Sequence, residues 1–153
     1  MKGRRLKRAH KALLLFKMTF GFRAPYHIAL DGDFISALLH YKIDCIEQMR
    51  KLFGGNVQLF VTPCIVRSLK HRADSSELLK ICKQFGMHHC SHPDTYTSRR
   101  CLMALTEDRG RRFALAVQNH DDLTIPGVPL LHMNMNVIVF EPPSKRSIEF
   151  SQM

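Results

Sequence analysis

Two cysteines and a histidine lie within twelve residues, in the segment CSHPDTYTSRRC at positions 90 to 101. Cys90, His92 and Cys101 offer two thiols and one imidazole, which are side chains that hold zinc in structural sites. No helical or strand period accounts for their spacing. The segment is therefore open to three interpretations: a metal site, a redox pair, or a coincidence of composition.

A structural zinc site needs four N or S ligands in a tetrahedron, so these three residues would require a fourth from elsewhere in the chain. The single residue between Cys90 and His92 is too short a spacing for a standard zinc-finger knuckle. Other cysteines and histidines that could complete the site are Cys64, Cys82, His88 and His89.

The number of cysteines also bears on the compartment. The chain has five cysteines, no apolar run long enough to span a membrane, and no small-residue cleavage site after the short stretch ALLLF. We therefore expect a soluble, intracellular protein in which disulfides do not form. In a reducing compartment, a cluster of cysteine and histidine favours metal binding over a disulfide.

Basic residues dominate the N-terminal part of the sequence. The formal net charge is +10, and the first acidic residue is Asp31. Such a segment repels itself, resists burial and attracts polyanions, so we predict contact with RNA; a solvated tail or a nuclear-import signal is the alternative. A second basic pair, Arg99 and Arg100, precedes Cys101. The basic residues before Asp31 are Lys2, Arg4, Arg5, Lys7, Arg8, Lys11, Lys17 and Arg23.

Helical and strand patterns alternate along the chain, which predicts an α/β domain of three layers with a mainly parallel central sheet. Pro63 suits the first turn of a helix that runs to about Arg72, and Ser75 or Ser76 suits the cap of the next helix. We expect a loop over Gly86–Ser98. The predicted helices span 5–22, 33–53 (as one helix or two), 63–72, 75–85 and 98–108, and the predicted strands span 27–30, 57–62, 113–117, 128–133 and 137–142.

Ligands of mainly parallel sheets bind beyond the carboxyl ends of the strands. Asp31 follows the first predicted strand, and the segment QNHDD follows the strand predicted over 113–117. We therefore expect a polar site where these two strand ends meet.

Four segments, FGFRAPYHIALDGDF, CSHP with the later cysteine, IPGVPLLHM and EPPSKRSIEF, occur in this order. Together they resemble a PIN-domain family of the eukaryotic small-subunit processome, the U-three-protein twenty-three family, over nearly the whole chain. The resemblance implies a PIN-like domain at residues 24–143 with an embedded zinc site. A basic N-terminal arm, 1–23, would precede this domain, and a C-terminal tail, 144–153, would follow it.

The resemblance also allows the acidic positions of active PIN domains to be checked. Those domains cleave RNA with several carboxylates that hold divalent metal ions. Asp31 matches the first of these positions. The next three positions are matched by Ser68, Arg100 and Asn119, with Lys70 near the second, Asp121 two residues after the last, and Asp33 and Asp122 as additional carboxylates nearby.

Two carboxylates that face an arginine make a poor site for a divalent cation, because the positive charge lowers metal affinity. We therefore interpret the site as a vestigial nuclease pocket, with Asp31 and Asp121 as remnants, that attracts RNA without cleaving it. Asp31 has an alternative role as the cap of the helix that follows it. The alternative function is an active metal-dependent endoribonuclease of pre-rRNA.

For the cysteine and histidine cluster, the resemblance implies a C-C-H-C zinc site made of Cys64, Cys90, His92 and Cys101, with Cys82 as the alternative to Cys64. Four protein ligands leave no position for a catalytic water, so the zinc would be structural. The function implied is that of an RNA-binding ribosome biogenesis factor of the nucleus and nucleolus, acting in small-subunit rRNA maturation. Its partners would be pre-rRNA, a small nucleolar RNA and small-subunit processome proteins, with no membrane and no small-molecule substrate.

Overall fold

The structure, a computed structural model, describes residues 3–107, 113–118, 125 and 127–143. Lys2, Asn119, Asp121, Asp122 and the predicted tail lie outside the described residues. None of the described helices is both long enough and apolar enough to cross a membrane.

A six-stranded sheet forms the centre of the molecule, in the order β3-β2-β1-β4-β5-β6. All neighbouring strands are parallel except β5 and β6, which pair antiparallel. The predicted α/β architecture with a mainly parallel sheet is confirmed. The strands are β1 (Tyr26–Leu30), β2 (Val57–Val61), β3 (Gly86–Met87), β4 (Phe113–Ala116), β5 (Leu130–Asn134) and β6 (Val137–Phe140).

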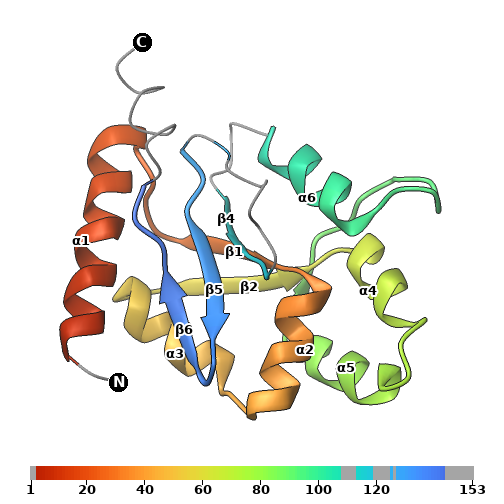
Figure 1. Cartoon of the computed structure of the whole chain (residues 1–153). Coiled ribbons are helices and arrows are strands. Elements are labelled where there is room, and N and C mark those ends of the chain that lie inside the picture. Colours follow the sequence, from red (N-terminus) through yellow and green to blue (C-terminus); the bar gives the residue numbers. More distant parts are fainter. Residues whose placement is uncertain (1–2, 108–112, 119–124, 126, 144–153) are drawn as a thin grey trace.

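The helices form two groups around this sheet (Figure 1). α1 and α3 pack on each other and on β6, whereas α2, α4, α5 and α6 pack together at the other side of the molecule. The apolar side chains of both groups and of the sheet form one continuous core. The helices are α1 (Gly3–Phe20), α2 (Gly32–Tyr41), α3 (Cys45–Phe53), α4 (Pro63–Leu69), α5 (Ser75–Cys82) and α6 (Ser98–Thr106).

The basic N-terminal segment is part of the core, which corrects the expectation that it resists burial. α1 buries Ala9, Ala12, Leu13 and Phe16, whose spacing places them on one side of a helix. The ring of Phe16 lies 6.1 Å from that of Phe140 on β6. The cations occupy the other positions of the helix and stay largely in solvent. Charge repulsion therefore did not prevent burial, because the apolar stripe and the charged surface lie on different sides.

The remaining differences from the predicted elements are local. The segment 33–53 forms two helices, because Lys42 adopts a left-handed conformation (φ 53°) that ends α2 and Asp44 then caps α3. Asp74, rather than Ser75 or Ser76, stands at the cap position of α5. The expected loop after Phe85 begins with strand β3, whose two residues pair with β2 but are too few to show a strand period.

Replacing Phe16 tests whether α1 belongs to the core. Phe16 is 2% exposed, so Phe16→Ala should lower the free energy of unfolding by about 3–5 kcal/mol. Leu14→Ala on the same helix is the matched control, because Leu14 is 54% exposed, and its effect should stay within about 1 kcal/mol. Urea unfolding measures both values. If Phe16→Ala lowered the free energy of unfolding as little as Leu14→Ala does, α1 would not contribute to the core.

Candidate metal centre and neighbouring pocket

Three separate parts of the chain bring four metal-ligating side chains together. Cys64 lies in the first turn of α4, Cys90 and His92 lie in the loop after β3, and Cys101 lies in α6. One ligand atom from each of these residues lies within 4.8 Å of those of the other three. These are the four residues that the family resemblance grouped.

Three of the distances among these atoms match the edges of a tetrahedral zinc site. The sulfur of Cys90 lies 3.6 Å from that of Cys64 and 3.8 Å from that of Cys101, and Nδ1 of His92 lies 3.5 Å from the Cys64 sulfur. A tetrahedron with Zn–S bonds of about 2.3 Å and a Zn–N bond of about 2.0 Å has S···S edges of about 3.8 Å and S···N edges of about 3.5 Å. The donor set and its spacing therefore fit one zinc ion.

The other interpretations of the cluster fit the geometry less well. Sulfur separations of 3.6 and 3.8 Å are far longer than the disulfide bond of about 2.05 Å. Cys82, the alternative ligand, is buried in the apolar core rather than in the cluster. His88 packs its ring against Phe60 and Phe113. Of the candidates for the fourth ligand that these observations locate, Cys64 is the one beside Cys90 and His92.

Three thiols in such close contact favour a bound cation. Burial raises the pKa of Cys64, and it raises the pKa of Cys101 to about 12. Burial also opposes ionisation of Cys90, but hydrogen bonds from the Cys64 backbone and from the neighbouring thiols outweigh it and lower the Cys90 pKa. Without a metal, at most part of the cluster is thiolate. A divalent ion stabilises all three thiolates together and cross-links the three segments that carry them.

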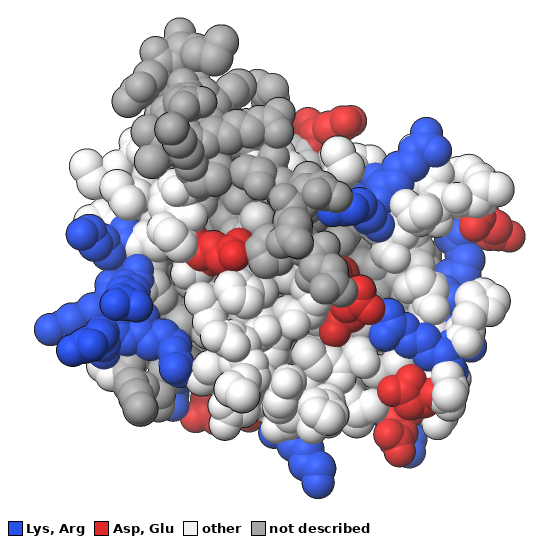
Figure 2. Space-filling view, in the orientation of Figure 1, with Lys and Arg blue, Asp and Glu red and all other residues white. Residues whose placement is uncertain are grey.

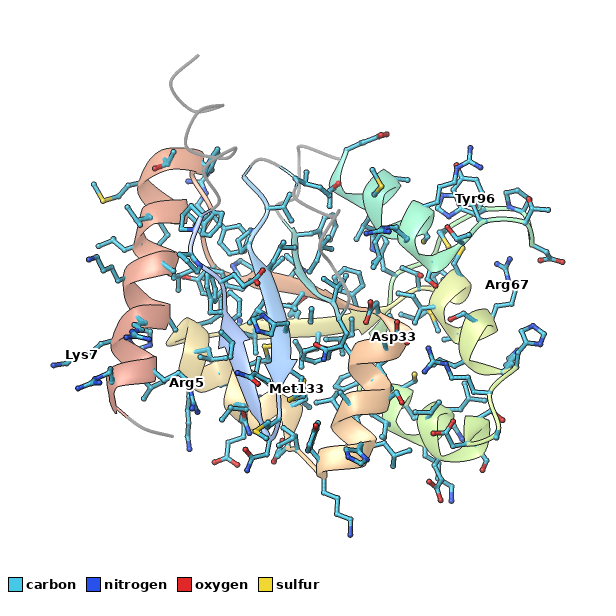
Figure 3. The ribbon with its side chains drawn as sticks, in the orientation of Figure 1. Arg5, Lys7, Asp33, Arg67, Tyr96 and Met133 are labelled. Carbon is cyan, nitrogen blue, oxygen red and sulfur yellow. The ribbon has the colours of Figure 1, made fainter. Side chains whose placement is uncertain are left out.

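The loop that carries His92 is also held by side chains outside the ligand set. The Arg67 guanidinium donates to the Pro93 carbonyl at 3.2 Å, pairs with Asp94 at 3.2 Å, and lies 3.7 Å from the Cys64 sulfur. Arg67 and Tyr96 both lie on this side of the molecule (Figure 3). Arg67 therefore ties the loop to α4 next to the metal ligands.

A stack of three side chains joins the same loop to α6. The Tyr96 ring lies parallel to the His92 ring at 4.1 Å, and the Arg100 guanidinium lies over Tyr96 at 4.4 Å from the ring centre. Thr97 begins α6 by accepting a hydrogen bond from the Arg100 backbone N–H. The stack thus connects a candidate zinc ligand to a basic side chain at the surface.

A pocket of about 230 Å³ lies where the carboxyl ends of β1 and β4 meet, as the strand-end argument predicted. Asp31 follows β1, and Val117 and Gln118 follow β4. The walls are completed by the first turns of α2 and α6, by Ser68 of α4, and by Arg72 in the turn after α4. The polar residues that line the pocket are Asp31, Asp33, Ser68, Arg72, Ser98, Arg99 and Gln118.

Asp31 caps the helix that follows it, which confirms the capping interpretation. Its Oδ1 accepts a hydrogen bond of 2.7 Å from the Phe34 backbone N–H. Burial raises the pKa of Asp31 to about 7, and the nearby Asp33 carboxylate adds to the rise, whereas the Phe34 hydrogen bond and the Arg72 charge oppose it. The first expected metal-binding carboxylate is thus engaged in capping and protonates near neutral pH.

The cations of the pocket differ from those expected. Arg72, which the sequence analysis did not place in the pocket, forms an ion pair with Asp33 at 2.6 Å, whereas Lys70 is exposed at the end of α4. Arg99 lines the pocket, and Arg100 stacks on Tyr96 instead, because the start of α6 at Ser98 sets which side of the helix each faces. The sequence does contain one signal that Arg72 lies near the pocket. Arg72 follows Ser68 by four residues, which is about one turn of the helix predicted over 63–72.

Ser68, at the second expected acidic position, lines the pocket but carries no charge. Its hydroxyl donates to the Ile65 carbonyl at 2.7 Å, within its own helix. The fourth position, Asn119, and the carboxylates Asp121 and Asp122 lie outside the described residues. Among the described residues, the pocket therefore offers two carboxylates and two arginines.

Comparison with known proteins places this chain in a family. The model of the Fcf1 family matches residues 51–142. The chain belongs to the Fcf1 family. It is 29% identical to the rRNA-processing protein utp23 of Schizosaccharomyces pombe, over 97% of the chain and 60% of that protein. It is 24% identical to the rRNA-processing protein FCF1 homolog of Homo sapiens, over 82% of the chain and 66% of that protein.

A solved structure confirms the fold. The structure of the PIN domain endonuclease Utp24 superimposes with a TM-score of 0.67 at 26% identity, and covers 76% of this chain and 92% of that one. The PIN fold and the family resemblance inferred from the motifs are therefore confirmed. The chain spans less than two thirds of the length of the fission yeast and human relatives.

The raised pKa of Asp31 predicts a pH-dependent stability. Because the folded-state pKa is about 7 and the ordinary value is 3.8, the folded chain binds more protons between these values. The contribution is full below pH 3.8 and is lost as the pH rises through 7. Asp31→Asn keeps a capping oxygen but cannot ionise. Relative to the parent, this variant should gain up to about 4 kcal/mol of stability between pH 4 and pH 8.

Urea unfolding of both proteins at pH 4.5, 6 and 8 measures this difference. The pH dependence of the metal cluster is common to both proteins and cancels in the comparison. Stability curves that stay parallel across this range would contradict the assignment of a raised pKa to Asp31.

Proposed function

We propose that this chain is an RNA-binding ribosome biogenesis factor of the small-subunit processome, with a PIN domain that does not cleave RNA. It acts in small-subunit rRNA maturation and in the handling of a small nucleolar RNA. Its partners are pre-rRNA, that small nucleolar RNA and other processome proteins, and its location is the nucleus and nucleolus. The names of the relatives, all rRNA-processing proteins, support this proposal.

The observation that carries the loss of cleavage is the charge of the strand-end pocket. The Arg72 guanidinium pairs with Asp33 at 2.6 Å, so one of the two carboxylates described in the pocket already has a positively charged partner. Arg99 adds a second positive charge to the lining, and one carboxylate oxygen of Asp31 already accepts the capping hydrogen bond of α2. Positive charge next to the carboxylates opposes Mg²⁺ or Mn²⁺ and favours an RNA phosphate.

The proposed RNA contacts use two separate positive regions. Figure 2 shows lysine and arginine gathered over α1 and again at the opposite side of the molecule, beside the metal centre. Phosphate attraction at both regions would make binding strongly salt-dependent. The residues proposed for RNA contact are Lys2, Arg4, Arg5, Lys7, Arg8, Lys11, Lys17, Arg23, Arg99 and Arg100.

The proposed cofactor is one structural zinc ion held by Cys64, Cys90, His92 and Cys101. When bound, zinc supplies the positive charge that keeps the three thiols ionised. The residues between His92 and Arg100 are then held in place by the ligands at 90, 92 and 101, together with the Tyr96 stack. In this proposal the metal positions the basic side chains of α6 for RNA.

The second candidate function is a metal-dependent endoribonuclease. The solved structure that matches this fold is titled a PIN domain endonuclease, and Asp31 and Asp33 share one pocket. Under this alternative, Asp31 and Asp121 would hold the metal ion, with Asp122 or Asp33 as an additional ligand. The two candidates differ in whether purified protein cuts RNA.

Incubation with a single-stranded small-subunit pre-rRNA transcript and Mn²⁺ tests the proposed function. The parent chain should bind the RNA and leave it intact, with the same background as the Asp31→Asn variant. Cleavage by the parent that disappears in Asp31→Asn would establish the endoribonuclease instead.

The same transcript, titrated at several salt concentrations, should show affinity that falls steeply as salt rises. Arg99→Ala combined with Arg100→Ala should reduce the logarithmic salt slope by about 2, because about one counterion is released per phosphate contact. Lys80→Ala is the control, since Lys80 is exposed on α5 and outside the proposed RNA contacts. An unchanged slope in the double variant would remove α6 from the RNA surface.

A further inference from the structure

A groove of about 680 Å³ runs between α1 and the edge strand β6. α1 and β6 lie on the side of the molecule opposite α4 and α6, the helices that carry Cys64 and Cys101 (Figure 1). The volume of the groove falls in the range of sites that bury a ligand of moderate size. Neither the proposed zinc site nor the strand-end pocket includes any of the residues that line it.

One wall of the groove is strongly basic. Arg4, Arg5, Arg8 and Lys11 line it, all from the first three turns of α1. No carboxylate is among the described residues that line the groove. Figure 3 shows Lys7 pointing away from the body of the molecule, and Lys7 is not part of the lining. The cations of α1 therefore divide between the groove and the open solvent.

The floor of the groove is aliphatic. Ala12 and Leu15 of α1 line it together with Val137 and Val139 of β6 and with Pro142, which follows β6. Leu15 is 43% exposed, although it sits beside buried core residues of the same helix. Cations beside exposed aliphatic groups form a surface that matches carboxylates and apolar side chains on one ligand.

The backbone of β6 is the next part of this surface to consider. Within the described residues, β6 is the last strand of the sheet and pairs only with β5. The register of the pair and the bond from the Glu141 N–H to the Leu130 carbonyl direct the backbone of Ile138 and Phe140 away from β5. The Gln48 side chain accepts from the Ile138 N–H, so that outward group is already satisfied. Phe140 is only 5% exposed, so recognition in the groove rests on side chains rather than on the β6 backbone.

We propose that this groove binds an acidic segment of a partner protein that carries apolar anchor side chains. The carboxylates of the segment pair with Arg4, Arg8 and Lys11, and its apolar side chains cover Leu15 and Val139. This site goes beyond the proposed RNA contacts of α1, which need only cations. Binding of an acidic peptide by a preformed basic and apolar groove is a common mode of protein recognition.

Three other occupants match the groove less well. RNA would gain from the cations but not from the floor, because Phe140, the one aromatic residue among the described residues of the lining, is only 5% exposed and offers no stacking platform. Residues 144–153 of the chain contain Lys145, Arg146 and one acid, Glu149, so their charge does not complement the groove. A second copy would bring two α1 helices that contain no acidic residue against each other.

A display library of random dodecapeptides, selected on the full chain, identifies the preferred ligand chemistry. Enriched peptides should contain acidic residues together with leucine, isoleucine, valine or phenylalanine. A synthetic copy of the most enriched peptide, labelled with fluorescein, then serves as the probe in anisotropy titrations. Enrichment of basic peptides, or no enrichment over the uncoated support, would overturn the proposal.

Two matched pairs of substitutions locate the peptide in the groove. Lys11→Glu, inside the groove, should weaken peptide binding at least tenfold, whereas Lys7→Glu, outside it, should change binding less than threefold. Leu15→Ser should weaken binding about fivefold or more, and Leu14→Ser on the neighbouring exposed position should leave it unchanged. Loss with Lys11→Glu but not with Leu15→Ser would show nonspecific charge attraction and would refute the groove.

The same variants separate this proposal from the RNA function. Leu15→Ser should leave the affinity for the pre-rRNA transcript unchanged, because it removes no cation. If Leu15→Ser weakened RNA and peptide equally, the groove would belong to the RNA surface and the proposal would be wrong. Sedimentation that shows dimers of the parent and monomers of Leu15→Ser would assign the groove to a second copy and also overturn it.

Discussion

Three cysteine sulfurs and one imidazole nitrogen, drawn from three separate parts of the chain, lie within 4.8 Å of one another. Buried thiols at this spacing do not ionise together unless a cation compensates their charge, and the donor set fits zinc. The segment between β3 and α6 has little apolar content and consists largely of exposed residues. Its conformation therefore depends on the metal ligands, on Arg67 and on the Tyr96 stack rather than on the core.

The strand-end pocket lies next to this centre, and the two share α4 and α6. α4 supplies Cys64 to the cluster and Ser68 to the pocket, and α6 supplies Cys101 to the cluster and Arg99 to the pocket. A fixed position of both helices keeps Arg72 and Arg99 at the carboxyl ends of β1 and β4. In the proposed function, these two guanidinium groups oppose the binding of a divalent metal ion in the pocket.

Much of the fold was predictable because its signals are local. Examples are Pro63 at the start of α4, the glycine after α3 and the apolar runs of the strands. Each of these signals depends on only a few neighbouring residues. Asp31 was recognisable as a helix cap for the same reason. The burial of one side of α1 is likewise readable from the spacing of Ala9, Ala12, Leu13 and Phe16.

The parts that were missed depend on three-dimensional packing. The ion pair between Arg72 and Asp33 joins positions 39 residues apart, and no local sequence pattern predicts it. Arg99, rather than Arg100, lines the pocket because of the rotation of α6 about its own axis. A shift of the helix start by one residue changes which of the two side chains faces the pocket. The groove beside β6 exists because the sheet order leaves that strand at an edge. Strand order, helix rotation and long-range ion pairs are properties of the folded chain.

X-ray absorption at the zinc edge, recorded on the purified chain, tests the central claim most directly. The account predicts about one zinc per chain, with three sulfur neighbours at about 2.3 Å and one nitrogen at about 2.0 Å. Cys82→Ser should leave this spectrum unchanged, and Cys101→Ser should lower the sulfur number to two. A chain that carries no zinc, or a zinc ion surrounded by oxygen and nitrogen alone, would contradict the account.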